Sequence, residues 1–188
     1  MNLEAQLKAI AHETAWLMRA LRAVRAVDIP NGYVCSGAIR NAVWDALHNY
    51  SQSSFLADVD VGYFDAQDLS EASETEYERR LKEVEPELPW DVKNQAAVHL
   101  WFHKVFGHTV DPLTSMEDSA STWPEPAVCV ALRLDTDDHL EVIAPLGLDD
   151  LFGMVVRRNP RRVSAETYRD RVREKRYTER WPMVRVVA

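Results

Sequence analysis

The sequence predicts an α/β (α+β) fold: a mixed sheet of about five strands with helices mainly on one face. Short apolar or alternating segments, typical of strands, are interspersed with longer segments whose apolar residues recur every three or four positions, as in amphipathic helices. Turn-forming residues separate these segments. Strands are expected at residues 33–35, in the segment that carries Asp58 and Asp60, around Asp91, and at 127–134 and 140–144.

The composition is typical of a soluble globular protein. The chain has 188 residues, 46% of them hydrophobic and 28% charged, which suffices for one domain spanning residues 1–188. No apolar run approaches the roughly 18 to 20 residues of a membrane span, and the N-terminus lacks a signal-peptide pattern. Cys35 and Cys129 lie in predicted strands without metal-binding spacing. We therefore expect a reduced, cytoplasmic protein with no membrane contact.

The net charge of −8 is unevenly distributed. Residues 157–188, the basic C-terminal helical tail, hold eleven Lys and Arg against four Asp and Glu, so the rest of the chain carries −15. A basic segment on an acidic body is typical of an RNA or polyphosphate contact. The alternative is an amphipathic helix whose arginines pair with its own acids and with the acidic body.

The first element is expected to be one long amphipathic helix over residues 2–26. It would pack across the sheet or form a dimer seam, and the turn residues 28–32 would end it. The apolar stripe that predicts it recurs at alternating spacings of four and three: Leu3, Leu7, Ile10, Thr14, Leu17, Leu21 and Val24.

The segment after residue 32 combines a strand, a tight turn and a helix. The apolar strand 33–35 is followed by Ser36-Gly37 and then by a helix with apolar residues at helical spacing. Gly37 lets the backbone approach a ligand closely, and a helix N-terminus offers unpaired N–H groups to an anion. Arg40, one turn into the helix, adds a guanidinium. This pattern predicts a phosphate-binding turn.

The next strand carries two carboxylates. Successive strand residues face opposite sides, so Asp58 and Asp60 share one face while Val59 and Val61 share the other. Two partly buried like charges repel each other unless a cation lies between them. Hard oxygen ligands in this arrangement suit Mg²⁺ together with substrate phosphates. The pattern gives a two-metal phosphoryl-transfer hypothesis, and the alternative is an exposed edge strand with solvated aspartates.

Downstream, a helix is expected over residues 71–85, with Asp68 or Ser70 as its cap and Tyr77, Leu81 and Val84 facing inward. Trp90 and Val92 then flank Asp91 as the valines flank Asp60, which predicts another strand. The alternative interpretation of Asp91 is an N-cap for the segment that follows. Residues 96–101 fit a helix or a strand equally well by period.

The remaining elements follow from turn and cap signals. A capping box at residues 114–117 opens a short helix, and strands 127–134 and 140–144 form a hairpin with an acidic tip. A turn follows at 145–152, and its aspartates cap the turn or pair with arginines downstream. The last elements are an edge strand at 154–156 and a basic helix over 164–177 with Ser164 as N-cap.

Several motifs resemble known families. SGAIRN followed by DVDV resembles the Gly-Gly (or Gly-Ser) plus Asp-x-Asp signature of the DNA polymerase beta-like nucleotidyltransferase superfamily, and SGAIRN is similar to the GGxVRD turn in the head domain of CCA-adding enzymes. The chain from about residue 34 to 182 resembles an uncharacterised bacterial nucleotidyltransferase-like family through GAIRNAVWDALHNY, DVDVGYFD, PWDVKNQAAVHLW, TWPE, APLGLDDLF and RWP. Two departures are Ser36 in place of the first glycine and a longer segment between Gly37 and Asp58.

The resemblance implies Mg²⁺-dependent (or Mn²⁺-dependent) transfer of a nucleoside monophosphate from an NTP to a hydroxyl or phosphate acceptor, with release of pyrophosphate. It implies metal-binding and catalytic roles for three aspartates, Asp58, Asp60 and Asp91. Substrate-binding roles would fall to Ser36, Gly37 and Arg40 at the phosphates, Lys93 at the triphosphate, and Asn94 with Gln95 at the base or sugar. For the last three residues, hydrogen bonding within the fold is the alternative.

The sequence leaves the base, the acceptor and the oligomeric state open. The acceptor would be a small molecule or RNA. Two other functions are compatible with the same residues: a nucleotide-sensing module that binds without turnover, and an RNA-modifying transferase that uses the basic tail as the acceptor platform.

Overall fold

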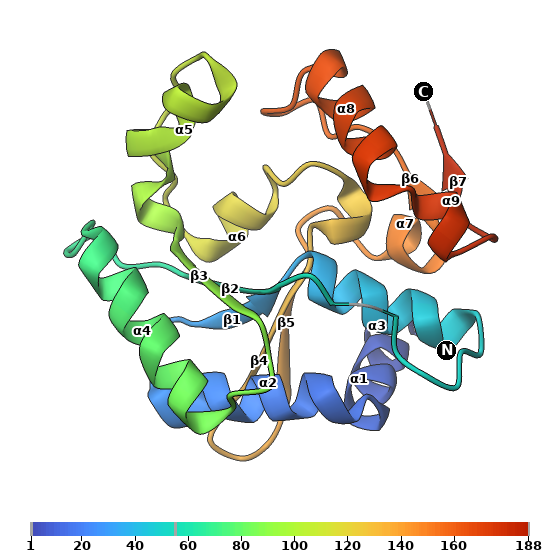
Figure 1. Ribbon diagram of the computed structural model, residues 1–188, viewed down its shortest axis with the longest axis horizontal. Helices are drawn as coiled ribbons and strands as arrows, with labels where there is room; N and C mark the ends of the chain where they lie inside the picture. The colour runs from blue at the N-terminus through green and yellow to red at the C-terminus, as the bar shows by residue number, and fades with distance from the viewer. Residues whose placement is uncertain (1, 55, 188) are drawn as a thin grey trace.

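A computed structural model describes residues 2–54 and 56–187 and contains the expected five-stranded mixed sheet (Figure 1). The strand order is β3-β2-β1-β4-β5. Only β2 and β3 run parallel, and the other neighbours are antiparallel. The strands are β1 (Tyr33–Cys35), β2 (Val59–Tyr63), β3 (Trp90–Asn94), β4 (Ala131–Leu134) and β5 (Leu140–Ile143).

The alternation of side chains gives the sheet two different faces. Val34 lies opposite both Val61 and Leu132, and Val61 lies opposite Val92; all four are at most 1% exposed. This apolar face packs against helices that precede or connect the strands, and it forms the main core. Those helices are α1 (Leu3–Glu13), α2 (Ala15–Val27), α3 (Gly37–Leu47) and α4 (Glu71–Val84). The opposite face is left to bear the polar residues of the strands.

The prediction of a single helix over residues 2–26 is wrong, because Thr14 divides this segment into α1 and α2. Thr14 has extended backbone angles (φ −88°, ψ 95°), and its hydroxyl donates to the carbonyl of Ile10 at 2.8 Å. The apolar spacing continues through this residue, so periodicity alone does not show the break. The division lets α1 pack on α3 while α2 crosses the apolar face of the sheet (Figure 1).

Helix α4 matches its expected range within one residue. Ser70 is its N-cap, and Asp68 accepts a hydrogen bond from the Ser70 N–H at 3.0 Å. Leu81 is fully buried, and the ring of Tyr77 packs edge-on against Tyr63. Val84 does not face inward as expected: it is the last residue of the helix and is 52% exposed.

Further elements stand over the polar face of the sheet. The ambiguous segment 96–101 is helical, and it belongs to η1 (Gln95–Ala97) and α5 (Val98–Phe106). In α6 (Met116–Ala120) the N-cap is Ser115, whose hydroxyl accepts from the Asp118 N–H, so the expected capping box is displaced by one residue. The expected strand 127–134 begins only at Ala131, because Pro126 opens a 3₁₀ turn, η2 (Pro126–Val128).

The C-terminal segments do not join the main sheet, and two of their aromatic residues pack against Trp44 of α3. They comprise α7 (Asp149–Phe152), β6 (Val155–Val156), α8 (Ala165–Lys175), α9 (Tyr177–Arg180) and β7 (Arg185–Val186). Strand β6 therefore does not extend the main sheet as expected; it pairs with β7 in a small parallel sheet. Trp181 is fully buried, its indole N–H donates to Asp45 Oδ1 at 2.7 Å, and its ring packs edge-on against Trp44.

Many basic side chains of residues 157–188 pair with acids of this same chain. Arginines 157, 161 and 171 pair with Asp150, Asp118 and Glu125, and arginines 173 and 176 pair with Asp170 and Glu179. The structure thus favours the second interpretation of the basic segment, internal pairing. Within the described ranges, no helix is both long enough and apolar enough to cross a bilayer.

Candidate functional site

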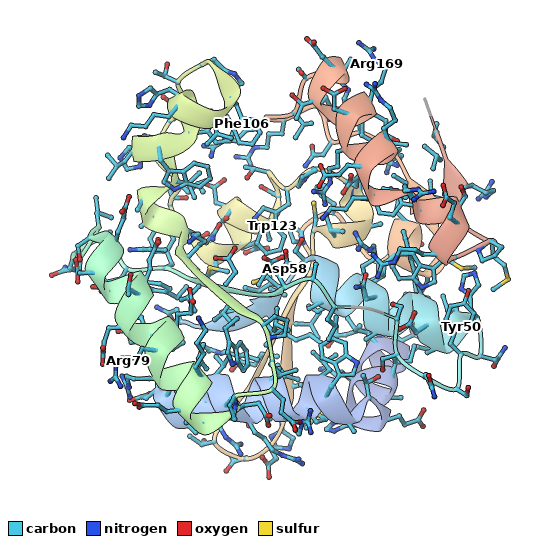
Figure 2. The ribbon with its side chains drawn as sticks, in the orientation of Figure 1. Tyr50, Asp58, Arg79, Phe106, Trp123 and Arg169 are labelled. Atoms are coloured by element: carbon cyan, nitrogen blue, oxygen red, sulfur yellow. The ribbon has the colours of Figure 1, made fainter. Side chains whose placement is uncertain are left out.

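A cavity of about 670 Å³ lies over the polar face of the sheet, between α5 and α8. Figure 2 shows this arrangement: Phe106 marks the α5 side, Arg169 the α8 side, and Asp58 lies near the strands. The expected site residues that line the cavity come from three separate segments of the chain: Ser36, Gly37, Arg40, Asp58, Asp60, Asp91 and Lys93.

Asp60 and Asp91 lie side by side because β2 and β3 are parallel and pair these two residues directly. Asp58 lies just before β2 rather than within it, and its side chain is exposed. Burial, followed by repulsion from Asp58 and Asp91, raises the pKa of Asp60 to about 7, and Arg171 and Lys175 act in the opposite direction. The three acids thus share one region of the cavity and influence each other.

The Asp91 carboxylate is engaged by a neighbour on its own strand. Lys93 shares the face of Asp91, and its ammonium lies 3.1 Å from Asp91 Oδ1 and 3.7 Å from Glu74 Oε2. In the described part of the chain, no three His, Cys, Asp or Glu side chains are grouped closely enough to hold one metal ion. Of the three aspartates, Asp58 and Asp60 are thus the two open toward the cavity.

The turn before α3 is conformationally unusual. Ser36 has φ 56° and ψ −118°, a region that a residue with a Cβ rarely occupies. The conformation is held by the Ser36 N–H, which donates to Val130 at 2.9 Å, and by its carbonyl, which accepts from the Arg40 N–H. Such strain persists where surrounding structure imposes it, often at ligand sites. It brings the N-terminus of α3, at Gly37, to the cavity wall.

Arg40 is buried beside this turn and is only partly hydrogen-bonded. It is 4% exposed, and its guanidinium carbon lies 5.1–5.5 Å from the ring centroids of Trp44, Tyr177 and Trp181. Nη2 donates to Asn41 at 2.7 Å, whereas Nε and Nη1 have no partner among the described residues. A buried guanidinium with unused donors in a cavity wall is well suited to bind an anion.

Asn94 is placed differently from the expectation that it contacts substrate. It is fully buried and does not line the cavity. Its amide donates to the carbonyls of Asp65 and Asp68, and its carbonyl accepts from the Asp65 and Ala96 N–H groups. All its groups are used within the fold, which is the alternative role. Gln95 does line the cavity, and it accepts a hydrogen bond from Ser119 at 2.6 Å.

Helix α8 contributes residues that the sequence did not single out. Thr167, Arg171 and Lys175 recur every four positions and all line the cavity. Arg171 is fixed by Glu125, whose Oε1 also accepts from the Tyr177 hydroxyl. The four-residue spacing of Arg171 and Lys175 shows that they share a helix face, but only the packing of α8 over the sheet shows what that face meets.

A strained turn at a helix N-terminus, a buried arginine and adjacent strand carboxylates thus meet in one cavity over a mixed sheet. The sequence profile of a family described as nucleotidyltransferase matches residues 22–186. The chain belongs to this nucleotidyltransferase family, whose class of reaction is nucleotidyl transfer.

Solved structures agree with this assignment. An NMR structure described as revealing a CCA-adding enzyme head domain is 28% identical, with a TM-score of 0.81 over 97% of this chain and 95% of that chain. A CCA-adding enzyme in complex with CTP has a TM-score of 0.57 at 14% identity, over 100% of this chain and 44% of that chain. The second likeness concerns the fold alone. No significant match is found among curated protein sequences.

Proposed function

We propose that the protein transfers a nucleoside monophosphate from an NTP to a hydroxyl or phosphate acceptor and releases pyrophosphate. The observation that carries this proposal is the side-by-side placement of Asp60 and Asp91, with Asp58 nearby, in the cavity that the Ser36-Gly37 turn also lines. The similarity to a head domain of CCA-adding enzymes supports an NTP donor.

The triphosphate would lie between the turn and α8. Backbone N–H groups at Gly37, the unused donors of Arg40 and the cations of Arg171 and Lys175 supply positive charge from two sides of the cavity. Because Arg40 and Arg171 are held by buried partners, they need little reorganisation when the phosphates arrive. Ser36 adds a hydroxyl at the same turn.

The acidic residues fit a divalent cation. Their donors are all hard carboxylate oxygens, and Asp60 is half-buried beside two like charges, which a bound cation would offset. Asp58 and Asp60 would hold Mg²⁺ or Mn²⁺ together with phosphate oxygens. The ion would neutralise charge on the α-phosphate and the leaving pyrophosphate.

The chain's own groups then position the reactants. The acceptor oxygen attacks the α-phosphorus, the bond from that phosphorus to the bridging oxygen of the β-phosphate breaks, and pyrophosphate leaves. The proton of the acceptor hydroxyl passes to Asp91, whose Oδ1 also pairs with Lys93. Positioning and charge neutralisation account for most of the catalysis of such a loose transition state.

The test is consumption of labelled NTPs by the Asp58→Asn variant across a panel of acceptors that includes cell extract. Asp58 is exposed, so the substitution should fold normally while activity falls more than about 100-fold. Asp137→Asn, on the exposed β4–β5 hairpin tip, is the matched control and should retain full activity. Equal pyrophosphate release by D58N and the wild type would exclude this mechanism.

Nucleotide sensing without turnover is a second candidate. The ion pair between Lys93 and Asp91 favours it, because Lys93 already binds the carboxylate that was expected to be the third catalytic acid. A sensor would show a large thermal shift with one NTP and no pyrophosphate release. The RNA-modifying alternative has less support, since many arginines of the basic segment are paired within the chain.

A further inference from the structure

One wall of the cavity is apolar, in contrast to the charged wall formed by α8. It is built from α5 and the segment that follows it, and its residues are Val98, Trp101, Phe102, Val105, Phe106 and Leu113. Val105 and Phe106 are 64% and 41% exposed, so apolar surface is open to solvent inside a site for charged ligands. In Figure 2, Phe106 lies at the outer part of the gap between α5 and α8, and Trp123 and Asp58 lie nearer the sheet.

This wall presents aromatic rings on a fixed support. The rings of Phe102 and Phe106 have centroids 4.4 Å apart, and Phe102 also packs edge-on against His108. Phe102 is 8% exposed, so it is the buried base on which the more open Phe106 rests. A ring held in this way offers a flat surface without the entropy cost of ordering a mobile side chain.

A hydrogen-bond donor without a partner borders the aromatic surface. The guanidinium carbon of Arg162 lies 5.8 Å from the ring centroid of Phe102, and Nη2 donates to the carbonyl of Asp111 at 2.6 Å. Arg162 also lines the cavity. Its Nη1 is buried and has no partner within the described ranges. An unsatisfied buried donor is costly, which suggests that a ligand completes its hydrogen bonds.

These features together select a flat ring with hydrogen-bond acceptors at its edge. A phosphate or a sugar would gain little from the apolar wall, and an aliphatic chain would leave Arg162 unsatisfied. We infer that the nucleobase of the donor NTP stacks on the α5 wall at Phe106 and that Arg162 hydrogen-bonds its edge. This inference rests on the proposed function, which places the triphosphate at the other side of the same cavity.

The experiment measures binding by calorimetry for the full chain with Mg²⁺, using ATP, GTP, CTP, UTP and inorganic tripolyphosphate as separate probes. Phe106→Ala should weaken the tightest-binding NTP by about tenfold, as loss of one stacking partner does, and leave tripolyphosphate binding unchanged. Phe106→Trp should restore the affinity. Leu100→Ala removes a side chain that is 47% exposed on the same helix but outside the cavity lining, and it should bind like the wild type.

The outcomes separate the inference from the function on which it rests. Equal losses for NTP and tripolyphosphate, or an unchanged NTP affinity in Phe106→Ala, overturn the base-binding role. If Phe106→Ala binds NTP as tightly as the wild type but turns over more slowly, the apolar wall contacts the acceptor, and the base-binding role is again overturned. A wild type that binds neither NTP nor tripolyphosphate overturns the proposed function itself. Arg162→Met should narrow the spread of affinities among the four NTPs, and an unchanged spread removes Arg162 from the site.

Discussion

Asp60 is a half-buried carboxylate with two like-charged neighbours, so its charge opposes folding. Its pKa is raised from 3.8 to about 7, first by burial and then by Asp58 and Asp91. The folded protein therefore holds this proton more tightly than the unfolded chain does. Unfolding releases the proton between about pH 4 and pH 7, and stability falls as the pH rises through this window.

We expect Asp60→Asn to be more stable than the wild type at pH 8, by about 2–4 kcal/mol in metal-free buffer, with little difference at pH 4. The reason is that the amide keeps the shape of the carboxyl group and carries no charge. Urea unfolding at a series of pH values in EDTA measures the effect. Asp137→Asn, which removes an exposed charge of the same sign, should show no comparable pH dependence; a D60N curve parallel to the wild type would contradict this account.

Ser36 differs from the motif in residue type but keeps the backbone conformation of the turn. Its backbone adopts an angle pair that glycine accepts without strain, although serine occupies the position. The first glycine of the motif is thus replaced without loss of the turn, because hydrogen bonds to Val130 and Arg40 hold the backbone. The replacement also adds a hydroxyl to a residue that lines the cavity.

At the scale of elements, turns, strand alternation and helix caps were predicted correctly, because neighbouring residues in the sequence determine them. The Ser36-Gly37 turn, the valine–aspartate alternation of β2 and the Ser164 cap of α8 all lie where the sequence indicated. The break at Thr14 was not predicted because the apolar spacing continues through it. The cavity walls were not predicted either, since α5 and α8 are more than 50 residues apart in the sequence and face the same cavity only in the folded chain.

The contact between α9 and α3 gives an element-scale prediction. Trp181→Phe removes the hydrogen bond to the buried carboxylate of Asp45 and should lower the free energy of unfolding by about 1–3 kcal/mol. Because Trp181 also packs against Arg40, NTP affinity should fall as well. Denaturant unfolding and calorimetry measure the two effects.

Tyr50→Phe is the matched control, because it removes an exposed hydrogen bond from the Tyr50 hydroxyl to the carbonyl of Arg180. It should cost less than about 1 kcal/mol and leave NTP binding intact. If W181F were no less stable than Y50F, the buried bond would not be what holds α9 against α3.

For the whole molecule, we propose that residues 1–188 fold as one cooperative unit. Four residues from the basic segment belong to the main core: Tyr168, Tyr177, Trp181 and Val184, each at most 4% exposed. Their removal would expose Trp44 and the buried face of α3. The net charge of the chain changes from negative to positive near residue 157, but the hydrophobic core includes residues from both sides of that position.

A chain shortened to residues 1–156 should therefore lack a cooperative thermal transition, which circular dichroism measures. Arg173→Gln changes a side chain in the same segment that is 78% exposed, and it should melt like the wild type. A shortened chain that unfolds as sharply as the full one would show that the segment is a separate appendage. Deletion is thus unsuitable for testing RNA binding, and single exposed arginines should be replaced instead.

The position of α8 has a consequence for the order in which the site is completed during synthesis. A ribosome makes Asp58, Asp60 and Asp91 long before it makes Arg171, Lys175 and Trp181. Until then the nascent strands carry acids without the cations that face them in the finished protein. Under the proposed function, a translation product interrupted before α8 would therefore be inert toward cellular NTPs.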